Sequence, residues 1–429
     1  MMKRKFTKQE TSWMYYDWAS NAFSMIITTA IFPIFYKAQA TAAGVEAADS
    51  TAYLGYTIAI FTFILAMIGP VLGTIADYEG YKKRFFVSFL LLGLISTFSL
   101  IFVPEGEWLL LLILFTMASL GLTGANLFYD AFIIDVTDNK RMNKVSARGF
   151  GYGYIGGAIP FLISIAIILL AQEGIIPISS TTASKIAFLI AVIWWAIFSI
   201  PMIKNVKQIH GIKREPNPIR TSFRRLKETV TSIRQYKHLT IFLIAYFFYI
   251  DGVGTIISMS TAYGTDVGLS ATVLLVVLFV TQIVAAPFAI LYGRLADRFS
   301  AKLMLNIGVF IYIIVCIYGY FLETALDFWI LAMLVATSQG GLQALSRSYY
   351  AKLIPKHKSN EFFGFYNIFG KFASVTGPVL MGVTTQLTGK SNAGVLSLIV
   401  LFIIGAIVLA FVPSDKKLLN EQNGKLNVS

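Results

Sequence analysis

Two ionisable side chains lie deep inside long apolar stretches of the chain. Asp251 comes about 13 residues into the apolar run 239–263, and Lys371 comes about ten residues into the run 362–387. A charge at the centre of a lipid bilayer is costly unless it is paired or faces water. Such side chains bind a proton or a polar solute in a water-filled cavity, or they form a salt bridge that stabilises the fold. The residues alone leave both interpretations open.

Further polar side chains lie near the ends of other apolar runs. Asp17 and Asn21 stand among aromatic residues in the run 14–38, while Asp130 and Asp135 stand near the end of the run 107–133. Asp17 fits either a polar cavity or a belt of aromatic residues at the membrane surface. The side chain of Asp130 either lines a cavity or has a structural role, and the residues favour neither. We expect Asp135 at the membrane surface.

The chain offers little for catalysis or metal binding. Its one cysteine, Cys316, lies in an apolar run, and its three histidines, His210, His238 and His357, lie in or beside polar linkers. No disulfide framework and no Cys/His metal-binding spacing is present in the sequence, and neither is a phosphate-binding P-loop. We therefore expect no enzyme, no catalytic residue, no metal site, no cofactor and no direct use of ATP.

Composition indicates which elements hold these residues. The 429 residues are 56% hydrophobic and 13% charged, whereas soluble domains carry roughly 25% charged residues. A helix needs about 20 apolar residues to cross a bilayer. Twelve such runs lie near 14–38, 52–76, 84–104, 107–133, 149–171, 186–203, 239–263, 271–296, 303–322, 327–350, 362–387 and 393–412. The sequence therefore predicts an all-α membrane protein with twelve transmembrane helices.

The distribution of basic residues predicts how the helices are oriented. With twelve spans, 31 of the 35 Lys and Arg residues fall in the two terminal tails and the alternate loops on one side. Because cytoplasmic loops are enriched in Lys and Arg, we expect both termini in the cytoplasm, most simply of a bacterial cytoplasmic membrane. The net charge of +13 then faces anionic lipid, and no nucleic-acid partner is needed to explain it.

Two loops repeat one pattern. The loop after the second run reads Gly73-x-x-Ala76-Asp77-x-x-Gly80-x-Lys82-Lys83-Arg84, and the loop after the eighth run reads Gly293-x-x-Ala296-Asp297-x-x-x-x-Lys302. A second repeat relates Phe150-Gly151-Tyr152 to Phe363-Gly364-Phe365. These two sequence repeats predict two pseudo-symmetric six-helix bundles, with a substrate site between them. We place the halves at 1–203 and 239–413, a basic cytoplasmic linker at 204–238, and a polar cytoplasmic tail at 414–429.

The duplicated loop resembles the signature loop of the major facilitator superfamily. Within it, the segment Tyr16-Asp17-Trp18-Ala19-Ser20-Asn21-Ala22-Phe23 resembles the YDWANSAF hallmark of the vacuolar amino-acid effluxers of fungi and their bacterial relatives. Gly340-Gly341-Leu-Gln343-Ala-Leu-Ser346-Arg347-Ser348 and Asp251-Gly252-Val253 resemble that family too. Two positions depart from its pattern, since Ser20-Asn21 inverts the usual order and Asp130 replaces an expected Asn.

The resemblance implies that the two loops close a cytoplasmic gate. Alternatively, each loop is only a basic cluster at the cytoplasmic side with a glycine in its turn. Asp77 and Asp297 end their helices, where the helix dipole disfavours a carboxylate, so they need positive partners. Local basic residues, or the N-terminus of a helix in the other half, can provide them. We expect Arg148 to contact Asp297. Glu361 matches Arg148 in the other copy, so Asp77 should rely on backbone amides and nearby basic residues.

The resemblance also implies which residues line the cavity and which pack. It favours Asp17 and Asn21, because the first span lines the cavity in this superfamily. Together with Asp130, Asp251 and Lys371, which the residues themselves suggest, they are the candidate contacts for substrate or coupling proton. Separately, a stripe of small residues in the fifth run, Gly149, Gly153 and Gly157, allows close helix packing. We expect this stripe to pack the fifth span against the eighth.

These observations predict a secondary transporter that works by alternating access as a monomer in the lipid bilayer. The resemblance implies small polar solutes, amino acids above all, and efflux. Coupling to protons is a further expectation. A drug, sugar or lipid carrier of the same fold remains an alternative. So does a protein of another class, namely a membrane scaffold or sensor, or a membrane-embedded enzyme.

Overall fold

The computed structural model describes residues 5–213, 218–231, 236–266, 269 and 271–414, and for some helical residues, Lys371 among them, the backbone alone. Eleven helices in the described part are long and apolar enough to cross a membrane, and the 30-residue α14 is the twelfth long helix. Beyond Ser414, the expected polar tail lies outside the described residues. The predicted all-α fold is confirmed.

The first bundle contains the helices up to residue 205. Their bounds are α1 Lys8–Phe23, η1 Ser24–Ala30, α2 Ile31–Ala42, α3 Ala47–Ala76, α4 Tyr81–Ser99, η2 Leu100–Phe102, α5 Trp108–Ala131, α6 Ile133–Val136, α7 Met142–Gln172 and α8 Ser180–Asn205. Several helices begin or end outside the predicted apolar runs. The α7 helix begins at Met142 rather than near 149, because its polar first turns continue the helix beyond the apolar segment.

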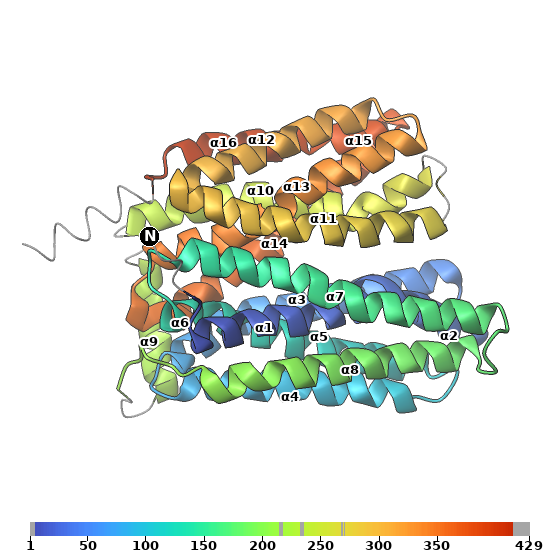
Figure 1. The fold of residues 1–429 in the computed structure, drawn as a ribbon, viewed down its shortest axis with the longest axis horizontal. Coiled ribbons are helices and arrows are strands. Elements are labelled where there is room, and N and C mark those ends of the chain that lie inside the picture. The colour runs from blue at the N-terminus through green and yellow to red at the C-terminus, as the bar shows by residue number, and fades with distance from the viewer. Residues whose placement is uncertain (1–4, 214–217, 232–235, 267–268, 270, 415–429) are drawn as a thin grey trace, which may run out of the picture.

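The second bundle follows a short linker helix, α9 Pro218–Thr231. Its elements are α10 Lys237–Asp266, α11 Ala271–Arg298, α12 Ala301–Tyr320, α13 Ala325–Leu353, η4 Lys356–Lys358, α14 Ser359–Thr388, α15 Ser391–Ser397 and α16 Ile399–Ala410. Figure 1 shows the two bundles side by side along their length, with α7, α11, α3 and α14 at the seam between them. The α9 helix crosses one end of the molecule.

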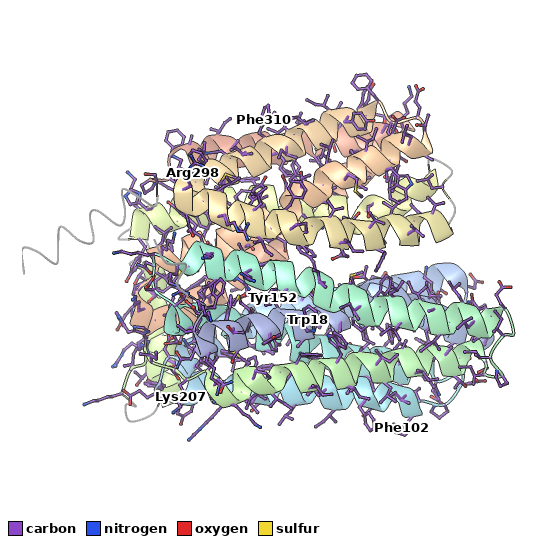
Figure 2. The ribbon with its side chains drawn as sticks, in the orientation of Figure 1. Trp18, Phe102, Tyr152, Lys207, Arg298 and Phe310 are labelled. Atoms are coloured by element: carbon purple, nitrogen blue, oxygen red, sulfur yellow. The ribbon has the colours of Figure 1, made fainter. Side chains whose placement is uncertain are left out.

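The short loops that carry most of the basic residues lie at the end where α9 lies, which we call the basic end. Lys207, just after the first bundle, and Arg298, at the end of α11 in the second, mark it in Figure 2. Along the sides of the bundles, large apolar side chains point outward. Phe102 and Phe310 are 67% and 60% exposed. Such a belt suits contact with lipid tails.

The first span is not a uniform α-helix. Residues Ser24–Ala30 form a π-helical segment between α1 and α2. Pro33 follows in the first turn of α2 and lacks the amide hydrogen that a regular helix would donate there. The π-helical segment therefore separates the part of the span that carries Asp17 and Asn21 from the part beyond.

Candidate functional site: a gate between the two bundles

Arg347 of α13 reaches from the second bundle into the first. Its Nη1 donates to Asp130 Oδ1 of α5 at 3.0 Å, and its Nη2 donates to Asp17 Oδ2 of α1 at 3.2 Å. The Nε atom donates to Ser146 Oγ of α7 at 3.0 Å. The guanidinium side chain is 4% exposed, against 11% for Asp17 and 16% for Asp130. We call Arg347, Asp17 and Asp130 the central ion-pair cluster.

Aromatic rings complete this cluster. The Arg347 guanidinium carbon lies 4.6 Å from the ring centre of Trp13 and 4.5 Å from that of Phe150. Planar guanidinium groups stack favourably on aromatic faces and bind carboxylates through several parallel donors. Each partner of Arg347 named here belongs to the first bundle, so the bundles cannot separate at this point without breaking ion pairs.

Asp77 forms a second contact between the bundles, at the start of α14. The backbone amide and side-chain amide of Asn360 donate to Asp77 Oδ1 at 2.9 and 2.8 Å, and the Glu361 amide donates to Oδ2 at 3.2 Å. Free amides of the first helical turn bind anions, and backbone amides are the partners that the sequence predicts for Asp77. Burial raises the pKa of the Asp77 carboxyl to about 7, although the Asn360 amide and Lys82 act in the opposite direction.

A third contact joins Lys82, Asp135 and the linker. Lys82 Nζ donates to Asp135 Oδ2 at 2.7 Å and to Ser359 Oγ of the second bundle at 3.0 Å. Asp135 Oδ1 accepts from the His210 amide at 2.8 Å and lies 3.1 Å from His210 Nδ1. Asp135 is 5% exposed, because Lys82 and the linker cover it, and its expected depth at the membrane surface stays a prediction.

The remaining residues of the first loop bind locally. Gly80 directly precedes α4 and has φ +80, a conformation that favours glycine. Lys83 Nζ donates to the Val206 carbonyl at 3.0 Å, and Arg84 lies over the Tyr81 ring at 5.4 Å. These two basic residues therefore stabilise the loop rather than bridge the bundles.

The second loop is built differently. Asp297 is exposed, and Arg148, expected to contact it, instead donates to the Tyr152 hydroxyl at 3.3 Å and lies over the Phe6 ring at 4.9 Å. Lys302 donates to the Ala410 carbonyl at the end of α16 at 2.8 Å, where helical carbonyls lack partners. The two copies of the loop are therefore similar in sequence and unequal in their contacts.

The two loop glycines allow the close approach of the bundles. A Cβ on Gly73 would lie 2.8 Å from the Asn360 carbonyl carbon, and a Cβ on Gly293 would lie 3.1 Å from the Asn143 carbonyl oxygen. Each glycine thus touches the backbone of the opposite bundle, and only a hydrogen at that position leaves enough room.

The glycine stripe of α7 does not pack where the sequence predicts. A Cβ on Gly153 or Gly157 would meet Asn21 or its backbone in α1, and one on Gly149 would meet Asp17. The expected packing of this stripe against the eighth span is wrong. Instead Gly151, on another face of α7, approaches the Ala286 carbonyl of α11. Helix periodicity explains the difference, since residues two apart face different directions.

Asp251 is buried in α10 against a glycine of α14. Its Oδ1 accepts from the Gly377 amide at 2.9 Å, and Oδ2 is buried without a hydrogen-bond partner among the described residues. The side chain of Lys371 lies outside the described part of the chain, so its pairing with Asp251 stays a prediction. Asn21 donates to the Asp17 carbonyl at 2.9 Å and faces α7.

Two pockets lie toward the end opposite the basic end. One of about 80 Å³ lies within the second bundle, and among its lining residues are Tyr263, Gln282 and Gln339. Another of about 290 Å³ lies in the first bundle beside Phe35, Gln39 and Gln172. The described contacts between bundles thus gather at the basic end, and the pockets open beyond them.

Solved structures of transporters share this fold. The human organic anion transporter MFSD10 (TETRAN) aligns with a TM-score of 0.72 at 12% identity, over 94% of this chain and 99% of that one. The major facilitator superfamily transporter FucP, in its outward conformation, aligns with a TM-score of 0.67 at 14% identity, over 95% and 98%. The fold is that of a major facilitator superfamily transporter.

Sequence comparison identifies the family. The family model described as "Vacuole effluxer Atg22 like" matches residues 6–138 and 134–422, and the chain belongs to this family. The MFS-type transporter YxiO of Bacillus subtilis (strain 168), described as uncharacterized, is 64% identical over 97% of both chains. Autophagy-related protein 22 of Eremothecium gossypii is 24% identical over 96% of this chain and 91% of its own. The protein is a multi-pass integral membrane transporter of the secondary type.

Proposed function

We propose that the protein moves small polar solutes across the membrane by alternating access, with amino acids as the substrate class and protons as the coupling ion. The observation that carries the proposal is the central ion-pair cluster. A guanidinium of one bundle sits between two carboxylates of the other, so its state of pairing is linked to whether the basic end is closed. Alternating access requires a link of this kind.

The cluster also supports proton coupling. Protonation of Asp17 or Asp130 would remove a negative partner of Arg347 and weaken the closed basic end. An amino acid carries both an ammonium and a carboxylate, and the cluster, together with Asp251 and Lys371, offers partners of both signs. The description of the family as effluxers favours export.

Domain organisation follows from the same cycle. The halves at 1–203 and 239–413 would move as two units, joined by the linker at 204–238. The positive-inside pattern of the sequence supports a cytoplasmic basic end, with both termini in the cytoplasm. A monomer is sufficient for this cycle, because both bundles belong to one chain, and no enzymatic step is needed.

Transport by purified protein in liposomes tests the proposal. Vesicles preloaded with an unlabelled mixture of amino acids should accumulate labelled amino acid by exchange, and an imposed pH gradient should drive net uphill movement. Asp130→Asn should keep exchange and lose accumulation driven by the pH gradient. Exchange of sugars or lipids, with none of amino acids, would refute the substrate class. Accumulation by Asp130→Asn equal to that of the wild type would remove Asp130 as a coupling residue.

A further inference from the structure

The linker helix α9 places an arginine between the two bundles. Arg225 Nη2 lies 3.8 Å from Asp77 Oδ2 of the first bundle and 3.7 Å from Glu361 Oε2 of the second. The Arg225 side chain is 9% exposed, and both carboxylates are fully buried. Arg225 belongs to the linker and to neither bundle. The linker therefore provides a cation at the contact between Asp77 of one bundle and Glu361 of the other.

Geometry indicates that this is an electrostatic contact rather than a hydrogen-bonded one. Arg225 Nη2 and both carboxylate oxygens of Glu361 are buried without hydrogen-bond partners in the described part of the chain. Without a nearby cation, two buried carboxylates would face one another across the seam. Removing one member of a buried charge cluster leaves an uncompensated charge and is strongly destabilising.

The remaining contacts of α9 also reach both bundles. Arg225 Nη1 donates to the Thr74 carbonyl of α3 at 3.5 Å, and its guanidinium lies over the Tyr78 ring at 5.6 Å. On the side of the second bundle, Lys358 Nζ donates to Thr229 Oγ1 of α9 at 3.4 Å. Figure 1 shows α9 lying across the ends of the long helices.

We propose that Arg225 is a gating residue and that α9 is a latch, docked across the seam while the basic end is closed and released when it opens. Opening separates Asp77 from Glu361, and Arg225 cannot stay within ion-pair distance of both. The linker is then a third moving part of the transport cycle and not only a connection between the bundles. This inference rests on the proposed alternating-access cycle.

Distance measurements between two spin labels test the latch without knowledge of the substrate. Lys140→Cys, before α7, and Phe299→Cys, after α11, place labels on exposed residues at the basic end. Cys316→Ser removes the native cysteine. In the full-length protein in liposomes, a short distance reports the closed basic end and a long distance reports the open one.

Arg225→Gln should raise the ratio of open to closed molecules about tenfold, because a partly buried cation facing two carboxylates is lost. Lys227→Gln is the matched control. It removes one positive charge from an exposed position of the same helix and should leave the ratio within about twofold. Arg225→Lys should fall between Arg225→Gln and the wild type.

The double variant Arg225→Gln, Glu361→Gln provides a second measurement. If Arg225 acts by neutralising Glu361, removing both charges should return much of the closed population and should fold even if Arg225→Gln alone does not. A ratio in Arg225→Gln equal to that in Lys227→Gln would overturn the latch and leave the transport cycle intact. A single distance in the wild type under every condition of pH and added solute would refute the cycle and the latch together.

Discussion

Neutralising Asp130 should open the basic end, since Asp130 holds one side of Arg347. Hydrogen bonds to charged groups contribute roughly 1.5–3 kcal/mol, and breaking a buried ion pair costs about 3–5 kcal/mol. Asp130 is 16% exposed, and Arg347 keeps Asp17 and Ser146 as partners. We therefore expect Asp130→Asn to cost the closed state about 2 kcal/mol, which corresponds to a ratio of open to closed molecules about 30 times higher.

The spin-label pair at positions 140 and 299 measures this ratio directly. Asp138→Asn is the matched control, because Asp138 is an exposed carboxylate near the same end whose described contact is the Arg141 amide at 3.0 Å. A distance distribution in Asp130→Asn that matches Asp138→Asn would show that the cluster does not hold the basic end closed. Arg347→Gln should have a larger effect than Asp130→Asn, because it leaves two buried carboxylates without their cation.

Other predictions concern the glycines, the second bundle and the topology. Gly73→Ala should destabilise the closed state by about 1–3 kcal/mol through overpacking, and the same spin-label distances measure this change. Gly382→Ala is the control and should have no such effect, because a Cβ there meets no atom within 4 Å. Asp251→Asn and Lys371→Met should each lower the melting temperature of the protein. If the two side chains pair, the double variant should recover that temperature. Strictly additive decreases in the melting temperature would show that the side chains do not meet. A reporter inserted at 210–230 should be cytoplasmic and one at 40–50 external. An external signal from 210–230 would disprove the twelve-span topology.

Local sequence patterns were sufficient to predict the helices and the loops at the basic end. Apolar runs and basic loops reflect the difference between lipid and water, and each segment responds to that difference through its own composition. Asp77 could be recognised from the residues next to it in the sequence, because they belong to the repeated loop pattern. Arg347 and its partners have no such local signal, because Asp130 and Asp17 are 217 and 330 residues away in the chain.

The contacts of Arg347 and Arg225 could not be predicted from the distribution of basic residues. Arg347 and Arg225 lie on the side where Lys and Arg are expected for topology alone, so neither stood out in the charge pattern. Arg347 was visible only as part of the Gly340–Ser348 motif. The contacts of Asp135 had no local signal either, since the linker binds it through backbone amides that any sequence would provide.

The π-helical segment Ser24–Ala30 gives the first span a way to change its register. A helix turns by about 100° for each residue, so passing the extra residue of a π-helical turn to one side rotates the segment on that side by about this angle. Asp17 lies before the segment, and Gln39, beside the pocket of the first bundle, lies after it. A shift of this kind would roll the part of the span beyond the segment about its own axis and turn a different set of side chains toward that pocket, while Asp17 stays paired with Arg347.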